Sequence, residues 1–171
     1  YGTGGTVSGV GRVLREKSPG TKIILTEPEN AALIGSELKQ DRHSDNTPAT
    51  SHSSWNPHLI QGWTPDFIPF VLQEAIDNNY FDKLLPVSGE QGITWAKRLA
   101  RAEGIITGIS GGSTFAIAME VAKDAPPDSN ILCMLPDTGE RYLSSPLFEE
   151  IPEEMTDDEK KISLSTPNYQ L

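Results

Sequence analysis

Tyr1-Gly2-Thr3-Gly4-Gly5-Thr6 begins the sequence and leads into Val7-Ser8-Gly9-Val10-Gly11-Arg12, whose apolar spacing predicts a short helix. The first N–H groups of a helix lack intrahelical partners, and the helix dipole adds partial positive charge at that end. Glycines let the backbone close around an anion, and threonine hydroxyls add donors. The turn therefore predicts a phosphate site, although it matches neither the nucleotide P-loop nor the dinucleotide motif. A plain turn without a ligand is the alternative.

The bulk composition narrows the classes of protein to which the chain can belong. A chain of 171 residues can bury a core and suggests one domain. The net charge of −10 and a pI near 4.7 argue against a large nucleic-acid interface, which needs a basic surface. No apolar run approaches the ~20 residues of a membrane span, so we expect no membrane insertion. Because neither a Met nor a strand precedes the Gly-Thr turn, we expect the later part of a longer protein.

The cysteine and histidine residues indicate neither a disulfide framework nor a metal site. Cys133, the single cysteine, lies in the apolar run Ile131–Leu135, so we expect a buried core thiol, with a reactive thiol as the alternative. His43, His52 and His58 share one polar stretch without cysteine or carboxylate residues at metal-ligand spacing. We therefore predict no metal site.

Short apolar segments alternate with helical patterns along the chain, which predicts an α/β fold. We expect helices over residues 7–15, 67–76, 89–103 and 114–123, and strands over 22–26, 83–87 and 131–135. Ser88 and Gln91 have the spacing of a capping box, and Gly104 is placed to end the same helix. Because buried strands that alternate with helices usually run parallel, we expect a mostly parallel twisted sheet with helices on both faces.

Two segments differ in composition from the rest of the chain. Residues from about 39 to 58 are polar, with histidines and prolines, which predicts a long exposed loop or insertion. Residues 149–159 contain seven carboxylates and no basic residue, so we expect 149–171 to form an acidic peripheral tail. A single helical turn capped by Thr156 is expected there.

Three loops share glycines and hydroxyl-bearing residues and lie where strand–helix units of open α/β sheets bind their ligands. The first is the Gly-Thr turn, the second runs from Gly108 to Ser113, and the third runs from Pro136 to Ser144. Ser113 is expected to be no more than a helix N-cap. For Ser110, a cap and a ligand contact are both open.

The ordered motifs in these loops resemble the signatures of one enzyme family. They are Gly2-Thr3-Gly4-Gly5-Thr6, Gly108-Ile109-Ser110-Gly111-Gly112 and Asp137-Thr138-Gly139-Glu140-Arg141-Tyr142-Leu143-Ser144. Shorter matches are Thr26-Glu27-Pro28, Ile60-Gln61-Gly62 and Phe67-Ile68-Pro69. Together they resemble cysteine synthase (O-acetylserine sulfhydrylase), a family of tryptophan-synthase-β-like enzymes that use pyridoxal phosphate (PLP). The resemblance implies that residues 1–148 are the C-terminal part of such a catalytic domain, so that the fold is incomplete without an N-terminal portion.

The resemblance also implies roles for individual residues. The residues that would hold the PLP phosphate are Gly2, Thr3, Gly4, Gly5 and Thr6. Ser110 would hydrogen-bond the pyridine nitrogen, and a neutral hydroxyl there leaves that nitrogen unprotonated, which favours β-elimination over transamination. Gly62 would lie on the substrate side of the cofactor, and Pro136 and Asp137 would lie close to its ring.

The chain departs from the family pattern in several places. Gly111 stands where many members have a second serine, and the stretch from residue 39 to 57 looks longer than usual. Trp63-Thr64-Pro65-Asp66 replaces small residues, which should stiffen the substrate-side loop and weaken partner docking. The family's Schiff-base lysine and substrate-carboxylate loop lie upstream of the Gly-Thr turn. We therefore assign no catalytic residue within this chain and expect the chain alone to be inactive.

The activity that the resemblance implies is replacement of the acetate of O-acetyl-L-serine by sulfide, which gives L-cysteine. It also implies a homodimer, which we expect in the cytoplasm, with an organelle left open. Enzymes of the cystathionine β-synthase kind, or enzymes that use O-phosphoserine, are alternatives. A non-catalytic homologue that binds the C-terminal tail of serine acetyltransferase is a further alternative, and binding of a short peptide ending in Ile, measured beside turnover, separates it from an enzyme.

Overall fold

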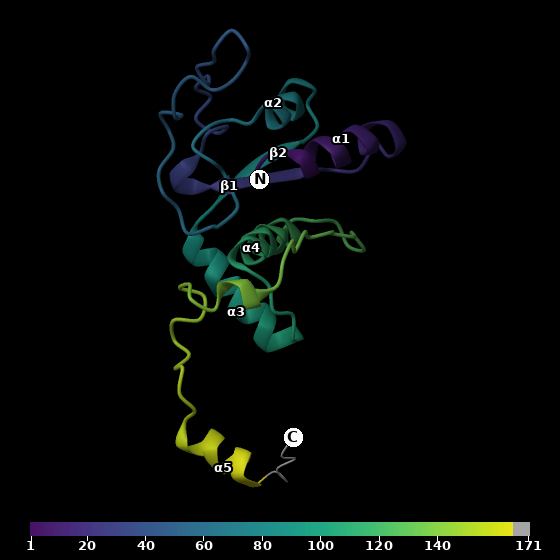
Figure 1. Ribbon diagram of the computed structural model, residues 1–171. Helices are drawn as coiled ribbons and strands as arrows, with labels where there is room; N and C mark the ends of the chain where they lie inside the picture. The colour runs from purple at the N-terminus through teal and green to yellow at the C-terminus, as the bar shows by residue number, and fades with distance from the viewer. Residues whose placement is uncertain (166–171) are drawn as a thin grey trace, which may run out of the picture.

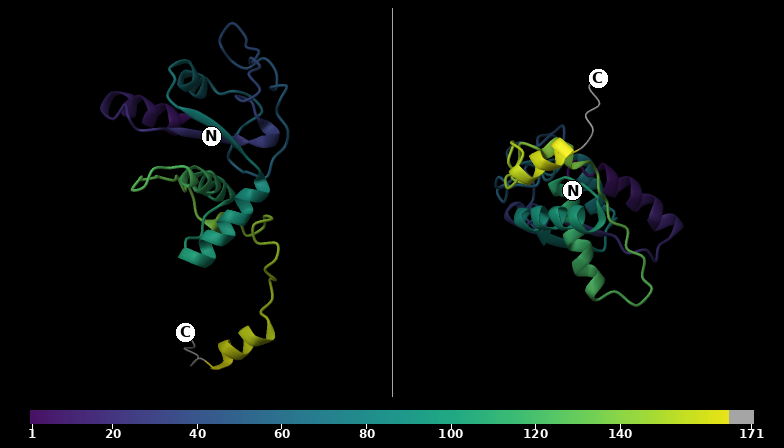
Figure 2. Two further views of the ribbon diagram at one scale, coloured as in Figure 1. Left: turned by 180° about the vertical axis from the view of Figure 1, so that it is seen from behind. Right: turned by 90° about the horizontal axis from the view of Figure 1, so that it is seen from below.

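Two parallel strands lie between two layers of helices in the computed structural model, which describes residues 1–165 (Figure 1). Strand β1 (Ile24–Pro28) pairs with β2 (Lys83–Val87), and the register places Ile24 opposite Lys83 and Pro28 opposite Val87. Helices α1 (Gly5–Lys17) and α2 (Phe70–Asp77) lie on one side of the strands. Helices α3 (Gly89–Glu103) and α4 (Ile109–Lys123) lie on the other (Figure 2). The predicted α/β fold with helices on both faces is confirmed.

The side chains of the strands alternate between two hydrophobic cores, as expected for period-2 structure. Leu25 and Leu84 belong to the core shared with α1 and α2, whereas Ile24, Leu85 and Val87 belong to the core shared with α3 and α4. The first core contains the buried residues Tyr1, Val7, Leu25, Ala31, Leu33, Ile68, Leu72 and Ala75. The second contains Ile60, Val87, Ala96, Ile109, Ala116, Ile117, Tyr142 and Leu147.

Helix α1 begins at Gly5, two residues before its predicted start, because Gly4 serves as the N-cap with φ at 90°. This left-handed conformation favours glycine. A Cβ on Gly4 would also lie 2.6 Å from the Cα of Leu72, so the start of α1 packs directly against the backbone of α2. Strand β1 extends to Pro28 instead of ending at Thr26, because a proline at the end of an edge strand need not donate a ladder hydrogen bond.

Local sequence signals account for the start of α2 and for both ends of α3. Helix α2 begins at Phe70 rather than at residue 67, since the residue before Pro69 is disfavoured in the helical conformation. The capping box of α3 is present as predicted: the Ser88 hydroxyl accepts from the Gln91 N–H, and the Gln91 side chain accepts from the Ser88 N–H, both at 3.0 Å. Gly104 ends α3 with φ at 70°. Local capping therefore sets both ends of this helix.

Helix α4 begins five residues earlier than predicted, at Ile109. The prediction of Ser113 as an N-cap is wrong, because its hydroxyl lies inside the helix and donates to the Ile109 carbonyl oxygen at 2.9 Å. The small residues of this turn allow α4 to approach α3 closely, and a Cβ on Gly112 would lie 2.1 Å from the Gly92 carbonyl oxygen. Tertiary packing against α3 thus overrides the low helix propensity of glycine.

The strand predicted over Ile131–Leu135 is wrong, since this part of the described chain forms neither strand nor helix. The sheet of residues 1–165 contains β1 and β2, and neither pairs with this segment. Leu132 is 94% exposed, and Cys133 is half-buried rather than a core thiol. An apolar run becomes a strand only where a neighbouring strand can receive its hydrogen bonds.

The two polar segments lie at the periphery of the fold. The loop over residues 39–58 has one isolated bridge, between Arg42 and Pro48, and buries His52. Helix α5 (Asp157–Ser165) is exposed along its length and follows a capping contact in which Thr156 Oγ1 accepts from the Glu159 N–H at 3.3 Å. It is longer than the single turn predicted, and residues 166–171 of the predicted tail lie outside the described residues. Among the described residues, every helix is too short or too polar to cross a bilayer.

Candidate functional site

The Gly-Thr turn is anchored to β1 by the first residue of the chain. The backbone nitrogen of Tyr1 donates to the Thr26 carbonyl oxygen at 3.0 Å, and its phenol donates to Glu27 Oε2 at 2.8 Å. The buried Glu27 carboxylate also accepts from the N–H groups of Ile34 and Gly35, at 3.2 and 2.9 Å. Burial and the Glu27 charge hold the pKa of the Tyr1 phenol well above its usual range, so the phenol remains a donor. The turn thus begins from a fixed point.

The predicted phosphate turn and the predicted substrate-side loop lie in direct contact. A Cβ on Gly2 would lie 2.5 Å from the Gly62 carbonyl oxygen, so glycine at position 2 is required for this approach. Gly62 itself has φ at 81°, a conformation that favours glycine. The Thr64 N–H donates to the Tyr1 carbonyl oxygen at 2.8 Å and joins the two segments again.

The start of α1 has the properties of an anion cradle. Thr3, Gly5 and Thr6 are exposed, whereas Gly4 is buried against α2. The first turn of α1 carries no acidic side chain, and Arg15 and Lys17 lie in its last turn. Unpaired N–H groups, the positive end of the helix dipole and exposed hydroxyls are what a phosphate requires. These residues therefore fit the phosphate of PLP.

A second group of polar side chains surrounds Ser110, which is buried in the first turn of α4. The Tyr142 phenol donates to Asp137 Oδ2 at 2.6 Å. Burial, followed by the hydrogen bond and charge of Asp137, raises the pKa of Tyr142 to about 12, while a hydrogen bond with Ser110 acts in the opposite direction. The Ser110 and Tyr142 hydroxyls are thus neighbours beside a carboxylate, and Tyr142 stays protonated at neutral pH.

Asp137 holds the 136–144 loop against the start of α4. The Asp137 carbonyl oxygen accepts from Thr107 Oγ1 at 3.2 Å, and a Cβ on Gly108 would lie 2.7 Å from Asp137 Oδ1. Oδ1 is buried without a hydrogen-bond partner among residues 1–165, which leaves one acceptor for a ligand or a water molecule. Pro136 lies next to this residue and is exposed.

The segment from Ile60 to Thr64 links the two groups of predicted site residues. Ile60 packs in the same core cluster as Ile109 and Tyr142, whereas Gly62 and Thr64 contact the start of the chain. The structure therefore brings Gly2 together with Gly62, and Ser110 together with Asp137, and places one short segment between the two pairs.

Sequence reasoning did not single out several residues that complete these groups. Tyr142 lies within a quoted motif, but its burial and its hydrogen bond to Asp137 appear only in the folded structure. Glu27 lies in a quoted motif too, but its partners are the Tyr1 phenol, 26 residues away, and two backbone N–H groups of the turn that follows β1, which no side-chain pattern indicates. Trp55 and His58 lie in a segment that we interpreted as a plain polar loop.

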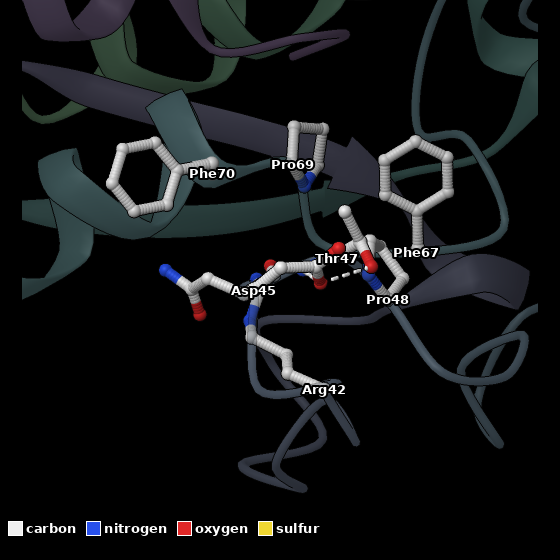
Figure 3. A pocket seen from close by; sticks show the side chains of 8 residues that line it. Arg42, Asp45, Thr47, Pro48, Phe67, Pro69 and Phe70 are labelled. Carbon is white, nitrogen blue, oxygen red and sulfur yellow. Dashed lines mark hydrogen bonds between the residues drawn. The ribbon is translucent and has the colours of Figure 1, made fainter.

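An open pocket of about 420 Å³ lies elsewhere, between the polar loop and the start of α2 (Figure 3). The Arg42 guanidinium donates to the Ile68 carbonyl oxygen at 2.6 Å, and Thr47 Oγ1 donates to Asp45 Oδ1 at 2.6 Å. The residues that line the pocket are Arg42, Asp45, Asn46, Thr47, Pro48, Phe67, Pro69 and Phe70. These residues include none of the predicted cofactor contacts, so the pocket is separate from the predicted PLP site.

Comparison with known proteins places the chain in a family. The family described as pyridoxal-phosphate dependent enzyme matches residues 1–137. The chain belongs to this PLP-dependent family. Its fold is that of tryptophan-synthase-β-like enzymes, and its cofactor is PLP, as the sequence motifs predicted.

Two relatives and one solved structure show which members of the family the chain is similar to. O-ureido-L-serine synthase of Streptomyces lavendulae is 39% identical over 166 residues, which cover 97% of this chain and 45% of that protein. Cysteine synthase of Staphylococcus aureus is 35% identical over 147 residues, which cover 86% of this chain and 41% of that protein. A crystal structure of O-ureido-L-serine synthase matches with a TM-score of 0.76 and 38% identity over 95% of this chain and 45% of that one. The chain therefore spans less than half the length of these relatives.

The half-buried Cys133 gives a prediction that depends on pH. Burial raises the pKa of its thiol to about 11 from 9.0, so the thiolate that reacts with alkylating agents is scarce at neutral pH. At pH 8 we expect iodoacetamide to modify Cys133 about 100-fold more slowly than the denatured protein, with a rate that rises up to about pH 11. Mass spectrometry of timed samples measures both rates. Equal rates for folded and denatured protein would contradict the burial of this thiol.

Proposed function

We propose that this chain forms the phosphate- and ring-binding part of an enzyme that makes L-cysteine from O-acetyl-L-serine and sulfide. The contact between Gly2 and Gly62 is the observation that carries the proposal, because it sets a phosphate turn beside a substrate-side loop with no room for a side chain. The similarity to cysteine synthase supports the same reading.

The residues of the Gly-Thr turn would bind the PLP phosphate through the N–H groups at the start of α1 and the hydroxyls of Thr3 and Thr6. When bound, PLP supplies an electron sink for chemistry at the α- and β-carbons of an amino acid. The protein binds and orients the cofactor and shields it from water.

Ser110 would place a neutral hydroxyl at the pyridine nitrogen. The Tyr142 phenol, which donates to Asp137 Oδ2 at 2.6 Å, is a polar neighbour of Ser110. Because Ser110 carries no charge, it does not stabilise a protonated ring nitrogen. This arrangement suits replacement at the β-carbon, the reaction that the proposal requires.

A second candidate is the formation of O-ureido-L-serine. The similarity to the synthase of that name covers 97% of this chain, compared with 86% for cysteine synthase. The β-carbon of that product carries a ureido group joined through oxygen. Hydroxyurea would supply this group as the nucleophile, in place of sulfide. The two candidates share the amino-acid half of the reaction and differ in what replaces the leaving group.

A panel of substrates tests the proposal on the complete protein loaded with PLP. O-acetyl-L-serine is offered with sulfide, hydroxyurea or homocysteine, and O-phosphoserine and serine are offered with sulfide. We expect the largest kcat/KM for O-acetyl-L-serine with sulfide. A larger value with hydroxyurea would assign the second candidate, and a larger value with homocysteine or O-phosphoserine would overturn both. The proposal includes a cytoplasmic homodimer on the family resemblance alone, and the mass in solution tests the dimer.

A further inference from the structure

Thr64, in the substrate-side loop, has an unusual backbone conformation. Its φ is 31°, in the left-handed region that a β-branched residue rarely adopts. It is also buried, with 1% of its surface exposed. Such a conformation is strained and persists only where the surroundings hold it. The contacts of Thr64 should therefore reveal what determines the shape of this loop.

Two side chains from the polar loop hold the carbonyl oxygen of Thr64. Trp55 Nε1 donates to it at 3.1 Å, and His58 Nε2 lies 3.1 Å from it. A carbonyl can only accept, so His58 Nε2 carries the proton in this contact. The other ring nitrogen, Nδ1, is buried without a partner among residues 1–165. The histidine thus serves as a donor toward Thr64.

The amide side of Thr64 is held by the start of the chain. Its N–H donates to the Tyr1 carbonyl oxygen at 2.8 Å, and its hydroxyl lies 3.5 Å from the same atom. The next residue, Pro65, has a fixed φ. Beyond it, the Asp66 carbonyl oxygen accepts from the His52 N–H at 2.6 Å. The loop is therefore tied to the polar segment on both sides of its strained residue and to the phosphate turn through Tyr1.

We propose that Trp55 and His58 are positioning residues that hold the substrate-side loop, through the Thr64 carbonyl, in the conformation that packs Gly62 against the phosphate turn. The link between these two residues and substrate binding rests on the proposed function. The hydrogen bonds from Trp55 and His58 to the Thr64 carbonyl, here called the brace, then connect the polar loop over residues 39–58 to the site. A loop held in this way is preorganised, so the substrate has less ordering to induce.

Hydrogen exchange of the Thr64 amide tests the brace without any turnover. In the complete protein we compare Trp55→Phe, which keeps an aromatic ring but removes the donor, and His58→Leu, alone and together. We expect the double variant to speed exchange of the Thr64 N–H by about tenfold, since two donors to one carbonyl are lost. Amides of α3 should exchange as in the unchanged protein. An unchanged Thr64 rate would overturn the inference.

Conservative and matched variants separate positioning from general destabilisation. His58→Gln restores an N–H donor at the same position and should return the Thr64 exchange rate to within about twofold of the original. Trp95→Phe, in the core formed with α3 and α4, and His43→Leu, in the polar loop, make the same chemical changes away from Thr64. Faster exchange at Thr64 in these controls, or no rescue by glutamine, would contradict a specific role.

Kinetics then connect the brace to the proposed function. For Trp55→Phe with His58→Leu we expect KM for O-acetyl-L-serine to rise about fivefold to tenfold while kcat changes less than about twofold, because the loop and not the chemistry is altered. A fall in kcat with unchanged KM would count against positioning. If the unchanged protein shows no turnover but the exchange results hold, the proposed function fails and the brace stands.

Discussion

Replacing Gly4 with alanine should weaken PLP binding by about 100-fold and lower the free energy of unfolding by about 3 kcal/mol. Gly4 is the N-cap of α1 with φ at 90°, so any side chain there is strained. The added Cβ would lie 2.6 Å from the Cα of Leu72, which is backbone and cannot rotate away. The start of α1 must shift, and the N–H groups that would meet the phosphate shift with it. Titration with PLP and urea unfolding measure the two effects.

Gly9→Ala is the matched control for this prediction. Gly9 lies in the same helix, and a Cβ there would meet nothing within 4 Å. Alanine favours the helix over glycine by about 0.5–1 kcal/mol, so this variant should be slightly more stable and bind PLP as before. Equal effects of the two substitutions would show that the geometry of the turn is not what holds the cofactor.

Replacing Ser110 with alanine should lower kcat of the PLP-loaded protein by about 10- to 100-fold and change the absorption spectrum of the bound cofactor. The substitution removes the hydroxyl that would meet the pyridine nitrogen and leaves the Tyr142–Asp137 hydrogen bond in place. PLP affinity should fall far less than for Gly4→Ala, because the phosphate contacts remain. Unchanged kcat and an unchanged spectrum would contradict the role of Ser110.

Ser113→Ala separates this role from general effects on α4. Ser113 lies three residues along the same helix and is also buried, but its hydroxyl donates to the Ile109 carbonyl oxygen. Its loss should cost about 1 kcal/mol of stability and leave kcat within about twofold. A loss of activity equal to that of Ser110→Ala would indicate distortion of the helix rather than a contact with the cofactor.

Elements with local signals could be predicted from the sequence. Strand β2 has its predicted bounds. Helix α3 begins and ends at its predicted caps, because Ser88, Gln91 and Gly104 bond to backbone groups only a few residues away. The presence of PLP chemistry could be predicted because the order of several glycine motifs is specific, although each motif alone is weak.

Features that depend on distant partners could not be predicted. The run Ile131–Leu135 has the composition of a strand, yet a strand needs a neighbour that no local pattern reveals. The early start of α4 depends on the close approach of Gly112 to Gly92. Thr64, with its positive φ, is hydrogen-bonded to Tyr1, 63 residues away, as well as to Trp55 and His58 of the irregular polar loop. A β-branched residue would by itself predict extended backbone.

The affinity of the complete protein for PLP relative to pyridoxal, which lacks the phosphate, tests the central claim most directly. If the Gly-Thr turn binds the phosphate, PLP should bind about 100-fold more tightly than pyridoxal, a difference of about 2.7 kcal/mol. Thr3→Val with Thr6→Val, which removes both exposed hydroxyls of the turn, should reduce that ratio to below about tenfold by weakening PLP alone. A ratio that stays the same in the double variant would contradict the claim that this turn holds the cofactor.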